Sequence, residues 1–313
     1  MEFAIISTLN GVTYGLLLFM VSAGLTLIFG MMGVLNFAHA SFYMLGAYVA
    51  YAVSSIFGFW TGILVAPIVV GLVGMAVERF LLPRVHAHGH AHELLLTFGL
   101  ALIIEELIKL FFGDFPVNYQ MPEALRFSAF EIFGTGYPFY RMFIGAVAVI
   151  MFTVLWLLLT RTRTGIVVRA AERLPQMAEA LGHNIPIVFM FVFGTGAALA
   201  GLAGAVAGAF YPTNPNMGIE LGVIVFVVVV VGGLGSLKGS LVASLLIGLF
   251  SSFAVGLDWS IASMFDVVGL GDWARSVGGL LTLELSSVSA TIPFALMLIV
   301  LLVRPAGLMG ERN

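Results

Sequence analysis

The chain has 313 residues, of which 61% are hydrophobic and 9% charged, and its formal net charge at pH 7 is −3. Together with a mean hydropathy of +1.11, this composition excludes an ordinary soluble domain and indicates a polytopic membrane protein. The absence of cysteine excludes disulfides, thiolate metal sites and cysteine nucleophiles.

Runs of about 20 apolar residues predict membrane-spanning helices. The candidates cover residues 4–30, 38–58, 61–82, 94–112, 140–160, 187–210, 219–234, 240–256 and 290–303. We therefore expect an all-α polytopic helical bundle with about eight or nine transmembrane segments, some of them glycine-broken or re-entrant. It would form one transmembrane domain over residues 1–313. No basic segment precedes the first run, so we expect that run to be retained as a helix and not cleaved as a signal peptide.

The charged residues predict the orientation of these helices. Residues 160–186 carry four arginines, so the positive-inside rule places this stretch in the cytoplasm. Counting spans outward puts the C-terminus on the same side and the N-terminus outside. Nine of the 13 lysines and arginines then share the cytoplasmic side, namely Arg79, Arg84, Arg161, Arg163, Arg169, Arg173, Lys238, Arg304 and Arg312.

The stretch GLTLIFGMMGVLNFAHASFYMLGAYVAY, residues 24–51, is an apolar helix that breaks at two glycines and then offers polar side chains. Such a break is costly in a bilayer unless it lines a cavity or packs against protein. A half-helix beginning near Asn36 would present free N–H groups to a carboxylate. We predict that Asn36, His39 and Ser41 line a substrate pathway, which requires residues 31–39 to dip back into the bilayer. The alternative is that Asn36 caps the helix and His39 donates to a neighbouring helix.

The run VHAHGHAHE places His86, His88, His90 and His92 at alternate positions, on one side of an extended strand. Metal chelation is conceivable there, but no carboxylate cage accompanies the histidines, and we expect no metal site.

Three charges interrupt the next apolar run, in LALIIEELIKLFF. Glu105 and Lys109 have the i,i+4 spacing of a helical ion pair, with Glu106 beside them. One interpretation is a polar pathway wall in which Glu105 contacts the ammonium group of a zwitterion. The other is an interfacial ion pair with snorkelling side chains.

The segment RAAERLPQMAEALG within the cytoplasmic loop 160–186 predicts a short helix broken at Pro175, with alanines on one side and charges on the others. Such a helix can dock into a groove of a soluble partner, or lie on the lipid headgroups. Its glutamates favour the partner.

Residues 29–50 and 231–250 each join an apolar run, a glycine-rich break and a helix that opens on small residues. Paired interrupted segments in the two halves of a transporter point toward its central site. The stretch VVVVVGGLGSLKGS, residues 227–240, overlaps the second segment. It is not a phosphate-binding loop, because Lys238 precedes Gly239 and the G-x-x-x-x-G-K-[ST] order is not met.

Five blocks of the chain carry a resemblance to a known family. They are GLTLIFGMMGVLNFAHASFYMLGAY, LLLTFGLALIIEELIKLFFG, TGIVVRAAERLPQMAEALGHNI, VVVVVGGLGSLKGSLVASLLIG and LLVRPAGLMGER. In this combination the sequence resembles the permease subunits of branched-chain amino acid ABC importers. The resemblance implies a coupling helix over residues 169–182. It implies ATPase docking by Arg169, Glu172, Glu179, Ala180 and Gly182.

The resemblance also implies a bacterial inner-membrane subunit with no cofactor and no catalytic chemistry of its own. Its partners would be a homologous second permease, two cytoplasmic ATPase subunits and a periplasmic solute-binding protein, with no nucleic acid. Family substrates extend from leucine, isoleucine and valine to other amino acids, amides, urea and aromatic acids, and the sequence does not select among them. The alternative function is a stand-alone secondary transporter or channel, with Glu105, Glu106 and His39 as a proton relay.

Overall fold

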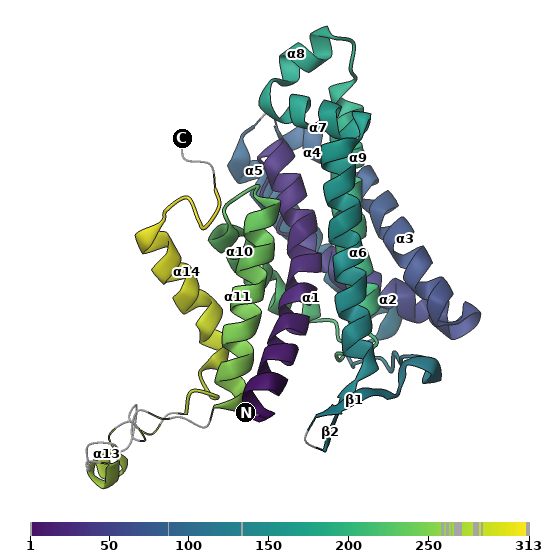
Figure 1. Cartoon of the computed structure of the whole chain (residues 1–313). Helices are drawn as coiled ribbons and strands as arrows, with labels where there is room; N and C mark the ends of the chain where they lie inside the picture. The colour runs from purple at the N-terminus through teal and green to yellow at the C-terminus, as the bar shows by residue number, and fades with distance from the viewer. Residues whose placement is uncertain are drawn as a thin grey trace.

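The computed structural model describes residues 2–86, 88–132, 134–257, 260, 263, 265, 271–277, 282 and 284–310. All nine predicted apolar runs are helices, so the all-α bundle is confirmed (Figure 1). They are α1 (Glu2–Met32), α2 (His39–Phe57), α3 (Phe59–Phe80), α5 (His90–Phe112), α6 (Phe139–Arg161), α9 (Ile185–Ala207), α10 (Met217–Gly232), α11 (Leu237–Gly256) and α14 (Ile292–Val303).

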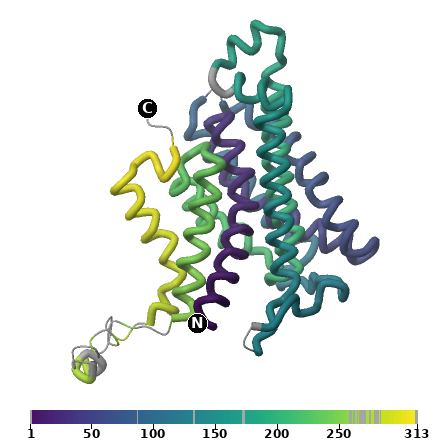
Figure 2. The backbone as a smooth tube through the Cα atoms, in the orientation of Figure 1, coloured from purple at the N-terminus to yellow at the C-terminus, as the bar shows by residue number. Residues whose placement is uncertain are grey.

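The shorter elements gather at the two ends of the bundle. Helices α4 (Leu82–His86), α7 (Arg163–Arg173) and α8 (Pro175–Ala180) lie at the same end as the C-terminus (Figure 1). We call this the α7–α8 end. The N-terminus, the antiparallel hairpin of β1 (Ser128–Ile132) and β2 (Thr135–Pro138), and α13 (Gly271–Val277) lie at the other, the hairpin end (Figure 2). Two 3₁₀ turns, η1 (Glu123–Leu125) and η3 (Ser289–Thr291), complete the described elements.

The two ends agree with the predicted division of charge, since the arginines of α7 and the hairpin's Glu131 lie at opposite ends. That the α7–α8 end faces the cytoplasm stays a prediction. Among the described residues, six helices are long and apolar enough to cross a membrane: α1, α2, α3 with α4, α6, α9 and α11. Helices α10 and α14 are apolar but shorter, and α5 carries the charges of Glu105, Glu106 and Lys109.

Helix α1 is the centre of the bundle, and every residue from Leu17 to Ile28 is buried. It runs antiparallel to α11 (Figure 1), and the two backbones nearly touch at small residues. A Cβ added to Gly15 would lie 2.7 Å from the carbonyl oxygen of Ser244. Further along the same pair toward the α7–α8 end, the hydroxyls of Thr26 and Ser240 share a hydrogen bond of 2.6 Å. Close approach through small residues is the usual way that membrane helices associate.

Helices α2, α3 and α9 pack together by the same means. A Cβ on Gly46 of α2 would lie 2.4 Å from the Cα of Gly201 in α9, and one on Gly204 would lie 1.9 Å from the carbonyl oxygen of Tyr43. Any larger side chain there would push the helices apart. The distance between α2 and α9 therefore depends on these glycines.

Candidate functional site

The predicted break between α1 and α2 turns back into the bundle. Helix α1 ends at Met32, Gly33 has a φ of +67°, and α2 begins at His39. The His39 Nε2 lies 2.9 Å from the carbonyl oxygen of Val21. Val21 precedes Met32 by eleven residues, about 16 Å along an α-helix. Residues 33–38 therefore run back along α1, and α2 starts beside its middle.

Asn36 lies two residues ahead of the cap position of α2. The residue before the first turn is Ala38, and it makes no side-chain cap. Instead, the Asn36 Oδ1 accepts a hydrogen bond from the backbone N–H of Ala38, at 3.0 Å. The capping alternative therefore holds in part: Asn36 accepts a bond from the N–H two residues on, as a capping residue does, but in the turn that leads into α2 and two residues ahead of the assigned cap position.

Asn36, His39 and Ser41 are all buried within this chain, with exposed fractions of 3%, 1% and 4%. His39 donates to α1, as the alternative interpretation held, and its ring lies beside Gly24. The Asn36 Nδ2 and the His39 Nδ1 have no hydrogen-bond partner among the described residues. Their role in a pathway stays a prediction.

A cavity of about 1030 Å³ opens at the α7–α8 end, directly beside the break. The end of α1, the α3–α4 corner, α7, α8, the start of α9 and the turn between α10 and α11 all contribute to its wall. Gly30 of α1 meets this turn at Gly235, where an added Cβ would lie 3.1 Å from the Gly235 Cα. The two glycine-rich breaks that resemble each other in sequence are therefore in contact.

Two buried carboxylates near this cavity were missed by our sequence reasoning. Glu78 of α3 is 6% exposed and lines the cavity, and its Oε2 has no hydrogen-bond partner among the described residues. Glu93 of α5 is 2% exposed and pairs with the Nδ1 atoms of His86 and His90, the latter at 3.2 Å. The available signal was that Glu78 is the single acid in the apolar run 59–82.

The histidine-rich run is not extended, so our prediction that its side chains share one side of a strand was wrong. His86 ends α4 and His90 begins α5. The tight turn between them brings both rings to Glu93, while the His88 and His92 rings lie 5.5 Å apart. No group of three or more His, Asp or Glu in the described part of the chain is arranged to hold a metal ion.

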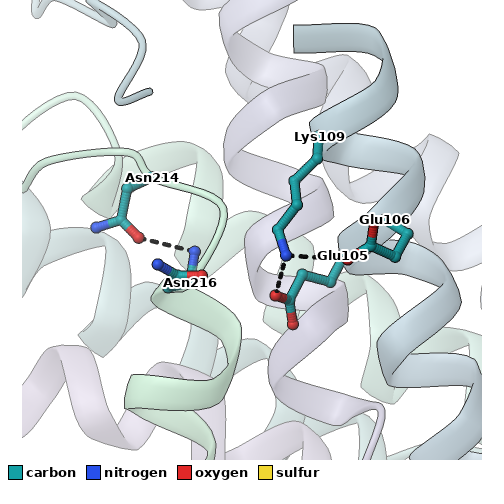
Figure 3. A network of polar contacts seen from close by, with 5 residues as sticks. All are labelled: Glu105, Glu106, Lys109, Asn214 and Asn216. Atoms are coloured by element: carbon teal, nitrogen blue, oxygen red, sulfur yellow. Dashed lines mark hydrogen bonds and ion pairs between the residues drawn. The ribbon is translucent and has the colours of Figure 1, made fainter. Parts of the chain in front are cut away.

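The charges of α5 form a local network (Figure 3). The Lys109 Nζ donates to the Glu105 Oε1 at 2.7 Å and to the Glu106 Oε1 at 3.0 Å, which confirms the i,i+4 pair. Glu105 is 8% exposed as a residue, whereas the Glu106 side chain is 73% exposed. Figure 3 also shows the turn in which Asn216 donates its backbone N–H to the Asn214 side chain. That Glu105 lies on a pathway stays a prediction.

The α7–α8 segment is a helix pair broken at Pro175, as predicted. Proline disfavours helical geometry in the residue before it and is well placed in a first turn. Helix α8 ends in a Schellman motif, with Gly182 at φ +88° and His183 N–H bonded to the Ala178 carbonyl. Ala178 packs with Ala171 and Ile185, which fixes the pair on the start of α9.

The predicted docking residues of this segment are on its surface. Arg169, Glu179, Ala180 and Gly182 are exposed, and the side chain of Glu172 lies outside the described part of the structure. An apolar stripe at α8 was not predicted: it consists of Met177 within the helix and of Leu174 and Leu181 at its two caps, which are 62%, 61% and 80% exposed. Their spacing of three and four residues is that of neighbours on one side of a helix, with Leu174 at the non-helical N-cap.

Comparison with known proteins adds the family context. Residues 7–301 match the family described as the permease component of branched-chain amino acid transport systems. The chain is 28% identical to the high-affinity branched-chain amino acid transport system permease protein LivH of Escherichia coli (strain K12), over 96% of this chain and 94% of that protein. The Salmonella typhimurium LivH is 27% identical and the Pseudomonas aeruginosa BraD 25%, each with the same coverage. No solved structure matches.

Proposed function

The chain belongs to the family of permease components of branched-chain amino acid transport systems, and from this we propose that it is the permease subunit of an ATP-driven importer. Its substrate would be a branched-chain amino acid or a related small solute. LivH and BraD are permease proteins of high-affinity branched-chain amino acid transport systems, which supports the amino acid class. The subunit itself is non-catalytic, and ATP hydrolysis takes place on separate partner subunits.

The observation that carries this proposal is the exposed apolar stripe of α8. Burying a leucine or methionine side chain is worth about 1.5–3 kcal/mol. Three such side chains at the end of a membrane bundle, with Glu179 beside them, favour a groove in a soluble partner over lipid headgroups. We assign this groove to a cytoplasmic ATPase subunit. Arg169, Glu172 and Glu179 would form the polar rim of the contact, and the small residues Ala180 and Gly182 would let the partner approach the backbone closely.

The position of α7 and α8 would allow a movement of that partner to reach the pathway. Ala171 and Pro175 line the same cavity as the glycine-rich end of α1. A displacement of the helix pair would therefore change the shape of the cavity where the α1–α2 break begins. The cavity opens at the α7–α8 end, which is the cytoplasmic side in our orientation, so this arrangement corresponds to release of the solute.

The remaining pathway residues belong to the same proposal. Asn36, His39 and Ser41 would form the inner wall at the depth where α2 begins, and Glu105 would present a carboxylate on the α5 side. A homologous second permease would complete the pathway and cover the exposed charge of Glu106, and a periplasmic binding protein would deliver the solute. The stand-alone proton relay has no comparable support, since His39 and Glu105 already bond to Val21 and Lys109.

The test is co-purification and transport with charged variants of the stripe. Met177→Asp and Leu181→Asp should lower recovery of the ATPase subunits with a tagged permease and should lower ATP-driven uptake in proteoliposomes. The matched control is Phe115→Asp, an apolar residue 83% exposed near the hairpin end, which should retain both. Wild-type recovery and uptake with both α8 variants would disprove the docking assignment.

A further inference from the structure

The buried carboxylate of Glu78 has no charge partner that the structure describes. It is 6% exposed, its Oε2 is without a hydrogen-bond partner among the described residues, and it lines the 1030 Å³ cavity. A carboxylate withdrawn from water is costly unless a cation or donor approaches it. A cation or hydrogen-bond donor can reach Glu78 through the cavity that it lines.

Neighbouring groups do not neutralise Glu78. Glu93 lies close enough for its charge to oppose that of Glu78. His86 also lines the cavity, but its Nδ1 is directed to Glu93, as is that of His90. Two carboxylates and two histidines therefore share this corner of α3, α4 and α5, and of the two carboxylates Glu78 is the one with no charge partner among the described residues.

The rest of the cavity wall suits a ligand that is apolar apart from its charged groups. Phe29, Met31, Val34, Leu82 and Phe189 supply apolar surface. Ser236 lines the cavity as the N-cap of α11, where its Oγ accepts a hydrogen bond from the Gly239 N–H at 3.1 Å. The positive end of the dipole of this 20-residue helix favours an anionic group beside it. A carboxylate for an ammonium group, a helix N-terminus for a carboxylate and apolar walls between them match an α-amino acid with an apolar side chain.

We propose that this cavity is a release site for such an amino acid, in which Glu78 binds the α-ammonium group. The inference rests on the proposed import function. It adds that the permease, and not the solute-binding protein alone, selects against solutes that lack an ammonium group. Glu78 is a binding residue, and Glu93 with its two histidines is a positioning group that holds the α4–α5 corner beside it.

The test is binding of radiolabelled leucine to the detergent-solubilised transporter, assembled with its partner permease and ATPases but without the solute-binding protein. Glu78→Gln should weaken leucine binding about tenfold or more, where tenfold corresponds to about 1.4 kcal/mol. Glu78→Asp should restore part of the affinity. The exposed Glu123, at the hairpin end, gives the control Glu123→Gln, which should bind as wild type.

Competition on the wild-type transporter tests the same inference without a variant, which matters if Glu78→Gln fails to assemble. 3-Methylbutylamine, which keeps the amine, should displace leucine, and 4-methylpentanoate, which lacks it, should not. Wild-type affinity in Glu78→Gln, equal competition by 4-methylpentanoate, or no leucine binding at all would overturn the inference. So would leucine binding that EDTA abolishes and Zn²⁺ restores, since the corner would then be a metal site.

Failure of the Glu78 inference and failure of the proposed import function give different experimental outcomes. ATP-driven uptake of leucine by wild-type proteoliposomes tests import by itself. If uptake occurs and the binding experiments fail, the Glu78 inference alone is wrong. If uptake never requires ATP, the importer proposal is wrong, whatever Glu78 binds.

Discussion

His39 of α2 donates a hydrogen bond from its Nε2 to the carbonyl oxygen of Val21 in α1, at 2.9 Å. A carbonyl can only accept, so the proton lies on Nε2. The bond joins the first turn of α2 to the middle of α1 and holds the intervening residues 33–38 folded back into the bundle. The hydrogen bond of the His39 imidazole thus helps to set how deep in the bundle α2 begins.

Replacing His39 by alanine should destabilise the protein. The variant loses a buried hydrogen bond and leaves a void beside Gly24, which together cost about 1–3 kcal/mol. The measurement is the melting temperature of the purified protein in detergent. The control is His88→Ala, because His88 is exposed and should melt as wild type. Equal melting temperatures for the two variants would show that the bond does not hold α2 in place.

Adding one methyl group at the α2–α9 contact should also be destabilising. In Gly204→Ala the new Cβ would lie 1.9 Å from the Tyr43 carbonyl oxygen, so the helices must separate, at about 1–3 kcal/mol. The matched control is Gly99→Ala in α5, where nothing lies within 4 Å of the new Cβ. That change should be neutral or stabilising by up to about 1 kcal/mol. A Gly204→Ala variant as stable as Gly99→Ala would contradict the packing.

Variants of α8 should separate docking from folding. Gly182 adopts φ +88°, so Gly182→Ala strains the end of α8 by about 1 kcal/mol, whereas Gly182→Asn is tolerated better. Glu179 is exposed, and Glu179→Ala should leave the melting temperature unchanged while lowering ATPase stimulation by substrate. Thermal unfolding and ATPase assays on the same preparations make the comparison. Full transport and stimulation with both residues changed would remove them from the coupling element.

The two glutamates of α5 offer a paired test of the pathway. Both bond to Lys109, but Glu105 is mostly buried and the Glu106 side chain is 73% exposed. If Glu105 lines the pathway, Glu105→Gln should lower uptake more than Glu106→Gln in proteoliposomes, at equal protein recovery. Equal uptake by the two variants would indicate a structural ion pair at the membrane interface.

Several features of the fold were predictable because their causes are local. Each of the nine apolar runs is a helix, since a backbone in lipid must satisfy its hydrogen bonds within its own segment. The helix breaks at Pro175 because the proline ring disfavours helical geometry in the residue before it. Glu105 and Lys109 form an ion pair because their i,i+4 spacing places them side by side on one helix. Composition by itself was enough to determine a polytopic helical membrane protein.

Tertiary structure alone decided where the polar groups lie. Of the alternating histidines, His86 ends α4 and His90 begins α5, and both contact Glu93. They meet there because the chain between the two helices is not an extended strand. Glu78 is buried beside a cavity whose wall α1, α3, α4 and α9 share, and Gly30 meets Gly235 because α1 packs along α11. Such contacts join segments far apart in the chain, and their geometry depends on how closely whole helices approach. No local pattern contains that information.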